Sequence, residues 1–337
     1  MVTRSEALCA IARVVHDTPH RFAHPWEKTS FQPAGEFRLR VFPNLFRSYV
    51  FTESRSWPRL PDSHSVSVLC SRCSRVRTMK YPGHVIKEGE SDKTIVAAIQ
   101  AQLDTRGCGP TDTTGIFGSA TKASVKLFQT RNVDAEGNPL KQDGKVGSLT
   151  WGALFGVETV PASTEPTSPF LGAVLLKATS QVGVLEQPKN SNSGPEVDGY
   201  LQRAGVPLNL PDNQKPWCCA FVYWCFDETA LAQGRPNPML KTASCLEHWN
   251  GAVGHGGRRI PATQATNDPA LITPGMIFII NHGGGRGHTG LVERVVAGFL
   301  HTIEGNTDAS LTREGGGVYR LTRKLCDINK GFLDYGA

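Results

Sequence analysis

The sequence predicts an α+β fold, in which several helices precede an antiparallel sheet, behind a smaller domain of three helices. Apolar residues recur at helical spacing through much of the chain as far as Phe226, whereas short runs rich in Ile, Val and Phe follow from Met276. Residues 158–169 are rich in Pro, Ser and Thr and have no apolar period. They predict a semi-extended linker between a domain at 79–157 and a domain at 170–337.

Residues 1–78 differ in composition from the rest of the chain. They hold 12 of the 36 Lys and Arg residues but only 6 of the 30 Asp and Glu residues, which accounts for the net charge of +6. No segment shows a clean helical or strand period, so we expect an Arg-rich leader that is disordered or that follows an incorrectly assigned start codon, with Met79 as the alternative start. Because no second pair follows at zinc-site spacing, we interpret Cys70 and Cys73 as incidental thiols.

Several functional classes are disfavoured by composition. The chain has no apolar run of 18 residues, so no membrane insertion is expected, and the apolar run Ala7–Val15 is interrupted by Arg13, unlike a secretory signal. The basic charge lies in the leader, so nucleic-acid binding is not expected. With an odd count of nine cysteines we do not expect a disulfide framework. We expect buried thiols at Cys108, Cys225, Cys245 and Cys326.

The first domain should contain three helices joined by two glycine turns. Spacing predicts helices at 94–103, 121–130 and 150–155 and turns at 115–118 and 144–147, and Asp92 or Ser91 could cap the first helix. The stretches GIFGSAT (115–121), VKLFQ (125–129) and DGKVG (143–147), together with Gln100, Leu103 and Thr150-Trp151, resemble the peptidoglycan-binding domain 1 family. Residues 134–142 depart from it like an insertion.

This resemblance implies peptidoglycan as the partner. Four residues near the turns are candidate contacts to a glycan or a peptide stem: Phe117, Gln129, Asp143 and Lys145. The residues alone leave an alternative open, since Phe117 can equally be a core aromatic, as we expect for Phe128 and Trp151.

The second domain should begin with helices at 171–182 and 196–204, a helix that carries Cys218, and a shorter element at 244–253; strands are expected at 276–280, 290–296, 299–304 and 317–321. Cys218 lies in the first turn after Pro216, where the free N–H groups and the helix dipole favour a thiolate. His288 lies between two glycines at the head of a strand. Glu304 and Asn306 are two positions apart and so share one side of a strand.

A cysteine nucleophile, a histidine base and a polar orienting group are the parts of an activated-thiol site. The stretches PWCCAFVYW (216–224), GHTGLV (287–292) and IEGNT (303–307), in that order, resemble the CHAP family of cysteine amidases and peptidases, which are papain-like relatives of the NlpC/P60 group. The resemblance covers about residues 170–330 and implies a papain-like fold. Met276 stands where the family usually has an acidic residue.

The resemblance implies Cys218 as nucleophile, because the family cysteine follows Trp directly, with His288 as base and Glu304 as orienting group supported by Asn306. Competing candidates are Cys219 for the nucleophile and His282 and His301 for the base. We expect the backbone N–H of Cys218 to hold the oxyanion, with Gln214 as a second candidate, and Trp217 to contact the substrate. We expect no cofactor and no metal; some relatives carry a calcium ion, but no Asp-rich loop has ligand spacing here.

The expected function is a peptidoglycan hydrolase, either an N-acetylmuramoyl-L-alanine amidase or an endopeptidase, that acts as a phage-type endolysin or as an antibacterial effector. We expect a monomer that is made in the cytoplasm and acts on the wall or in the periplasm after release or secretion, with a holin or an immunity protein as further partners. The alternatives are a non-catalytic wall-binding protein and a cysteine amidase or transferase acting on a non-wall amide.

Overall fold

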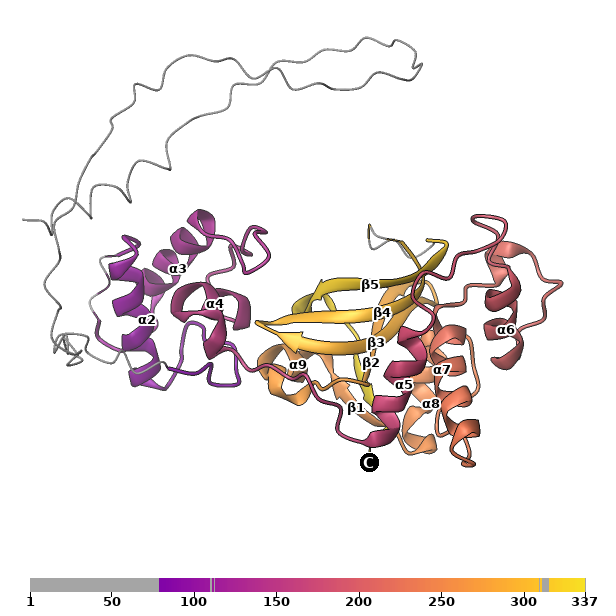
Figure 1. Ribbon diagram of the computed structural model, residues 1–337. Coiled ribbons are helices and arrows are strands. Elements are labelled where there is room, and N and C mark those ends of the chain that lie inside the picture. Colours follow the sequence, from indigo (N-terminus) through magenta and orange to yellow (C-terminus); the bar gives the residue numbers. More distant parts are fainter. Residues whose placement is uncertain (1–78, 110, 112, 309, 311–314, 337) are drawn as a thin grey trace, which may run out of the picture. The chain divides into compact units, whose positions relative to one another are not determined.

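The computed structural model describes residues 79–109, 111, 113–308, 310 and 315–336 (Figure 1). The expectations for residues 1–78, including the Cys70 and Cys73 thiols and the start codon, lie outside these residues. Among the helices of the described ranges, none combines the length and the apolar character that a membrane crossing requires.

The first domain has the three predicted helices, α2 (Lys93–Thr105), α3 (Ser119–Arg131) and α4 (Ser148–Phe155). Asp92 caps α2 as predicted, since its side chain accepts hydrogen bonds from the N–H groups of Thr94 and Ile95. The helices enclose one apolar core, whose fully buried members include Val96, Ile99, Leu103, Val125, Phe128 and Trp151. Phe128 and Trp151 are therefore core aromatics, as expected.

Two of the four residues predicted to contact a ligand are buried in the interior of this domain. Phe117 is 2% exposed and packs in the core. Gln129 is also 2% exposed, and its amide brackets the following glycine turn: Oε1 accepts from the Gly144 N–H at 2.9 Å and Nε2 donates to the Lys145 carbonyl at 2.8 Å. The prediction that Phe117 and Gln129 contact a ligand is therefore wrong, because neither side chain is exposed to solvent. Asp143 is half-buried and Lys145 is exposed, so their role stays a prediction.

The predicted linker at 158–169 is packed at both ends. Its first residues belong to the three-helix core, because Val160 is buried there and Thr159 accepts a hydrogen bond from the Trp151 indole at 3.0 Å. Further on, Ser163 exchanges two backbone hydrogen bonds with Val295 in the sheet. The segment is rich in Pro, Ser and Thr as a linker should be, but fewer of its residues lie outside packed structure than this composition predicted.

The helices of the second domain are α5 (Pro169–Thr179), α6 (Pro195–Arg203), α7 (Cys218–Ala232), α8 (Cys245–Gly251) and α9 (Ala262–Asn267). Ser168 caps α5, with Pro169 in the first helical position where a missing N–H does no harm. The sequence did not predict α9, which has only six residues and no apolar period. One-turn 3-10 helices join several of these elements.

Six antiparallel strands form one sheet in the order β1-β6-β2-β3-β4-β5. The strands are β1 (Arg258–Pro261), β2 (Ile277–Gly283), β3 (Arg286–Val296), β4 (Phe299–Thr307), β5 (Gly317–Lys324) and β6 (Gly331–Asp334). The α+β class is confirmed. The sequence missed β1 and β6, because four residues are too few to show a period of two.

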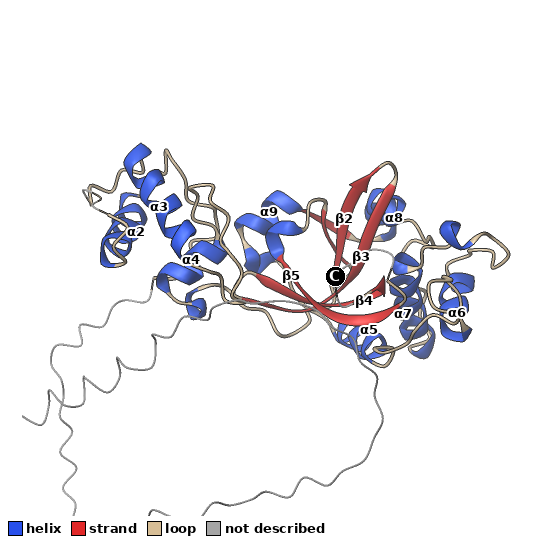
Figure 2. Cartoon of the chain, turned by 90° about the horizontal axis from the view of Figure 1, so that it is seen from above, coloured by secondary structure: helices blue, strands red, loops and turns tan. Residues whose placement is uncertain are grey.

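Strand alternation divides the apolar side chains between the two faces of the sheet. Ile277, Ile279 and Leu291 pack against α5–α8, whereas Phe278 and Val292 face the side of α9. Figure 2 shows α5, α7 and α8 gathered on one side of the strands and α9 on the other.

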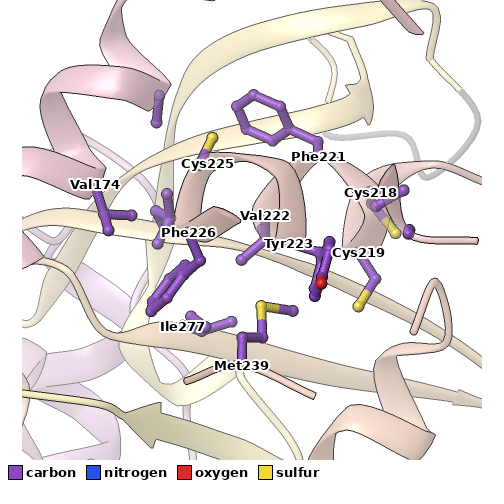
Figure 3. Packing of buried hydrophobic residues seen from close by; sticks show 14 of the residues in the cluster. Val174, Cys218, Cys219, Phe221, Val222, Tyr223, Cys225, Phe226, Met239 and Ile277 are labelled. Carbon is purple, nitrogen blue, oxygen red and sulfur yellow. The ribbon is translucent and has the colours of Figure 1, made fainter. Parts of the chain in front are cut away.

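Helix α7 is buried on nearly all sides, because helices cover it on one side and the sheet on the other. Figure 3 shows its buried side chains leaving the helix in several directions. Adjacent turns of this helix therefore contribute to different parts of one core, with Cys218 at its first position.

Of the four cysteines expected to be buried, Cys108, Cys225 and Cys245 are buried. Cys326 is exposed, so that expectation was wrong. It lies in a one-turn helix, Leu325–Asp327, on the connection between β5 and β6, and only Leu325 of that turn is buried.

Candidate active site

Cys218 opens α7 and faces a cavity of about 570 Å³. The cavity is lined by Cys218 together with Gln214, Cys245 and Arg286, among others, but not by Cys219. The Cys219 thiol instead donates to the carbonyl of Thr242 at 3.5 Å. Of the two adjacent thiols, only Cys218 therefore reaches the space where a substrate can bind, which supports its choice as nucleophile.

His288 lies in β3 beside Cys218 and is 1% exposed. Its Nε2 is paired with the Glu304 carboxylate at 2.7 Å. Its Nδ1 is buried and makes no hydrogen bond of good geometry among the described residues, yet the ring is close enough to the Cys218 thiol for each group to shift the pKa of the other. Nδ1 is thus the atom available to exchange a proton with Cys218.

The competing histidines have other surroundings. His282 is exposed in β2, and His301 is half-buried in β4, where Nδ1 contacts Arg294 and Thr322. His248 is fully buried and hydrogen-bonded to the hydroxyl of Tyr335 at 2.9 Å. Among the histidines of the described residues, His288 alone lies beside Cys218.

Glu304 is the centre of a buried polar network. Its carboxylate is 0% exposed and accepts two hydrogen bonds from Arg323, at 2.7 Å to Oε1 and 2.6 Å to Oε2. Thr302 donates a third at 2.5 Å, and His288 occupies the remaining side. A buried carboxylate needs such partners, because an unpaired charge in an apolar interior is strongly destabilising.

These contacts set the charges of the site. Burial alone would raise the pKa of Glu304, but Arg323 and His288 lower it to about 2. Burial would also lower the pKa of His288, and the interactions with Cys218 and Glu304 raise it to about 9. At neutral pH the pair is therefore an imidazolium held by a carboxylate, which fixes the ring and its protonation state.

Cys218 is subject to opposing influences. The Cys245 sulfur lies 3.6 Å from the Cys218 sulfur, and this contact, together with burial, raises the pKa of Cys218. His288 acts in the opposite direction, but the net result is a Cys218 pKa well above its ordinary value. The first turn of the 15-residue helix α7 also favours the thiolate.

Asn306 has a different role from the one predicted. It is 1% exposed and sits at a left-handed backbone position (φ +55°) at the end of β4. Placed so that its donors and acceptor are satisfied, its amide accepts from the Trp217 N–H at 3.3 Å and donates to Asn192 and the Gly315 carbonyl. It therefore positions the residue before Cys218 and makes no hydrogen bond to His288.

Of the two further predicted site residues, Trp217 is buried away from the cavity and Gln214 lines it. Trp217 is fully buried, with its indole donating to Glu186 at 2.8 Å, so the prediction that it contacts substrate is wrong. The Trp217 side chain instead packs in the core at the start of α7. Gln214 is exposed and lines the same cavity as Cys218, so it stays a candidate for the oxyanion site.

Comparison with known families agrees with this arrangement. Residues 210–306 match the family model "CHAP domain". The chain contains a CHAP domain. Residues 93–154 match a second model, "Putative peptidoglycan binding domain". Searches of curated proteins and of solved structures returned no match.

The CHAP match ends at residue 306, and the site extends beyond it. Arg323 lies in β5 and was not predicted, although strand alternation offered a signal: it follows Tyr319 and Leu321 on one strand face, where a charge needs a buried partner. Cys245 was predicted to be buried, but nothing in its sequence context placed it beside Cys218. In the described part of the chain, no group of three or more His, Cys, Asp or Glu side chains could hold a metal ion.

Gly290 allows the imidazole and the carboxylate of the CHAP domain to meet. Gly290 follows His288 by two residues in β3 and lies next to Glu304. A Cβ on Gly290 would come within 2.7 Å of Glu304 Cγ and 2.9 Å of Phe278. This close approach explains the glycine two residues after His288.

Gly290→Ala is expected to lower kcat/KM at least about tenfold and to destabilise the domain by roughly 1–3 kcal/mol, because Glu304 or Phe278 must move. Steady-state kinetics and thermal denaturation measure both effects. Gly199→Ala is the matched control, since a Cβ on that α6 residue meets nothing within 4 Å. A Gly290→Ala protein with unchanged kinetics and melting temperature would contradict the packing argument.

The His288 pKa of about 9 predicts the alkaline side of the pH profile. A leaving amine needs the His288 proton, so kcat/KM should hold through pH 8 and fall as the pH rises through about 9. Rates on a soluble amide substrate across pH 5–11, roughly the range that brackets the ordinary and the shifted pKa, measure this. A fall centred near the ordinary histidine value of about 6.5 would contradict it.

Proposed function

We propose that this protein is a peptidoglycan hydrolase that cleaves an amide bond in or next to the stem peptide by thiol catalysis. The observation that carries the proposal is that Cys218 lines a cavity and is backed by the buried pair of His288 and Glu304, in a chain that also has a peptidoglycan-binding domain. The CHAP match supports a cysteine-dependent amidase or peptidase.

The proposed reaction begins with the Cys218 thiolate attacking the amide carbonyl, with His288 holding the proton that the thiol has lost. The oxyanion is stabilised by backbone N–H groups at the start of α7, and the Gln214 amide faces the same cavity. His288 then passes its proton to the leaving amine, so that a thioester remains on Cys218. Water activated by neutral His288 cleaves the thioester and restores the thiol.

Glu304 and Arg323 support this cycle without contacting the substrate. The carboxylate keeps the imidazole in one orientation and stabilises its positive charge, while Arg323 and Thr302 keep the carboxylate ionised and fixed. Both are positioning residues: they act through His288.

We also propose how the enzyme reaches its substrate. The protein is made in the cytoplasm and acts on the wall after release as a phage-type endolysin or after secretion as an antibacterial effector. Finding a holin gene next to this gene would support the first route, and finding an immunity gene there would support the second. The peptidoglycan-binding domain raises the local concentration of substrate at the catalytic domain in both cases.

The test is a digestion of purified peptidoglycan of several chemotypes with the full chain, followed by mass spectrometry of the soluble products. Glycan strands free of stem peptide identify an N-acetylmuramoyl-L-alanine amidase, and new termini within peptides identify an endopeptidase. Either product supports the proposal. A folded protein that binds the wall and releases nothing from any chemotype would overturn it in favour of a wall-binding protein.

A further inference from the structure

A second thiol lies against the proposed nucleophile. The Cys245 and Cys218 sulfurs are 3.6 Å apart in van der Waals contact, and each cysteine occupies the first position of its helix, α8 and α7. A disulfide bond is about 2.05 Å long, so the two sulfurs, 3.6 Å apart, must approach by roughly 1.5 Å for the bond to form. Both residues line the same cavity, which gives small solutes access to them.

Cys245 is held in this place by several contacts. Ser244 caps α8 by accepting from the Glu247 N–H at 3.2 Å, and Thr242 donates to the Glu247 carboxylate at 2.7 Å. Gly287 in β3 lies directly beside it, since a Cβ on Gly287 would come within 3.0 Å of Cys245 Cβ. The sheet and α8 thus fix this thiol against Cys218.

We propose that Cys245 is a resolving thiol, and that the Cys218–Cys245 pair is a site of reversible oxidation by hydroperoxides. This rests on the proposed function only in taking Cys218 as the reactive thiol.

The reaction has two balanced steps. In the first, the Cys218 thiolate attacks one oxygen of hydrogen peroxide, the O–O bond breaks, and sulfenic acid and hydroxide are formed. In the second, the Cys245 thiol attacks the sulfenic sulfur, the S–O bond breaks, the S–S bond forms and water leaves. Two thiols are oxidised and one peroxide is reduced to two waters. A dithiol reductant reverses the change by thiol exchange.

This pair would determine how the enzyme responds to peroxide. A sulfenic acid without a neighbouring thiol proceeds to sulfinic acid, which thiols do not reduce. With Cys245 in contact, oxidation stops at a disulfide, in which Cys218 cannot attack a carbonyl. Activity is then lost under oxidising conditions and regained on reduction.

The experiment treats the full chain with hydrogen peroxide, blocks remaining thiols and maps tryptic peptides by mass spectrometry. The Cys245 peptide, residues 242–258, contains no other cysteine, whereas its partner peptide, residues 204–241, contains Cys218, Cys219 and Cys225, so fragment ions assign the bonded sulfur. We expect the Cys245 peptide joined to Cys218, with a loss of about 2 Da. We also expect hydrolysis to fall by about tenfold or more and to return with dithiothreitol, since the thiolate is the nucleophile.

Two variants distinguish the pair from other thiols. Cys219→Ser should still form the cross-link, because the Cys219 sulfur contacts the Thr242 carbonyl outside the cavity. Cys245→Ser, compared with its own untreated sample, should accumulate sulfinic acid on Cys218 and should not regain its starting activity with dithiothreitol. The cross-link is read without any wall substrate, so it is independent of the hydrolase activity. Recovery of Cys218 as thiol, as sulfinic acid in the unaltered chain, or bonded to another cysteine would overturn the proposal.

Discussion

Cys218→Ala is expected to lower the rate of peptidoglycan hydrolysis by about 10⁴-fold or more, to background, because the other site residues act only through this thiol. The side chain is small and faces a cavity, so the variant should fold with a melting temperature close to that of the unaltered protein. It should also still bind the wall through the separate peptidoglycan-binding domain. Turbidity clearing, mass spectrometry of products and wall sedimentation measure the three properties.

The neighbouring Cys219→Ala is the matched control. It removes the same atom one residue further along α7, but from a position that does not line the cavity. Hydrolysis should be retained, with a stability loss of about 1 kcal/mol from the small void. The opposite pattern, with activity lost in Cys219→Ala and retained in Cys218→Ala, would exchange the roles of the two thiols.

Glu304→Gln should have the next largest effect, because it removes a charge on which two buried cations depend. Arg323 and His288 both lose their carboxylate partner, and breaking such a buried pair destabilises a fold by roughly 3–5 kcal/mol. The rate should fall by about 10² to 10⁴, since the imidazole is no longer held in one orientation. Thermal denaturation and kinetics at fixed pH measure both losses.

The pH dependence separates this positioning role from a merely structural one. Glu304 helps to raise the pKa of His288 to about 9, so Glu304→Gln should move the alkaline fall in kcat/KM to lower pH. Because the pKa of Glu304 is lowered in the folded state, its ionised carboxylate stabilises the unaltered protein. This stabilisation is complete at pH values above the ordinary glutamate pKa and is lost as the pH falls toward about 2. The variant should lack that loss. An alkaline limb that stays at about 9 in Glu304→Gln would exclude the positioning role.

Glu293→Gln is the matched control for charge removal in the same sheet. Glu293 lies in β3 and pairs with Arg320 at 2.9 Å, with partly exposed side chains on both partners. Solvent-exposed ion pairs contribute only about 0–1 kcal/mol, so stability and the pH profile should change little. A loss as large as that of Glu304→Gln would mean that the sheet tolerates no charge removal, whatever the burial.

The sequence predicted those parts of the site that local patterns encode. A cysteine at a helix start, a histidine between glycines, and a carboxylate within a strand are visible without tertiary structure, and the structure brings Cys218, His288 and Glu304 together. What it could not predict were contacts between distant segments. Arg323 and Cys245 reach the site through strand pairing and helix packing; strand alternation marks the buried face of Arg323, but no spacing in the chain identifies the partner of either residue.

The errors have a related cause. Aromatic and amide residues near turns are typical both of ligand sites and of the supports beneath them. Trp217, Phe117 and Gln129 turned out to be supports, because each fills space or binds backbone in the interior. Asn306 likewise lies on the strand beyond Glu304, but its left-handed backbone turns its amide toward Trp217. Burial, which decides between the two roles, depends on the whole fold.

The end of β4 has a consequence for how the gene can change. Three consecutive residues there serve three partners: Glu304 holds His288, Gly305 leaves room for Trp217 and Phe221, and Asn306 bonds the backbone before Cys218. Inserting or deleting one residue in this strand would turn each side chain to the opposite face and separate nucleophile from base in one step. Length variation should therefore not be tolerated between residues 299 and 307.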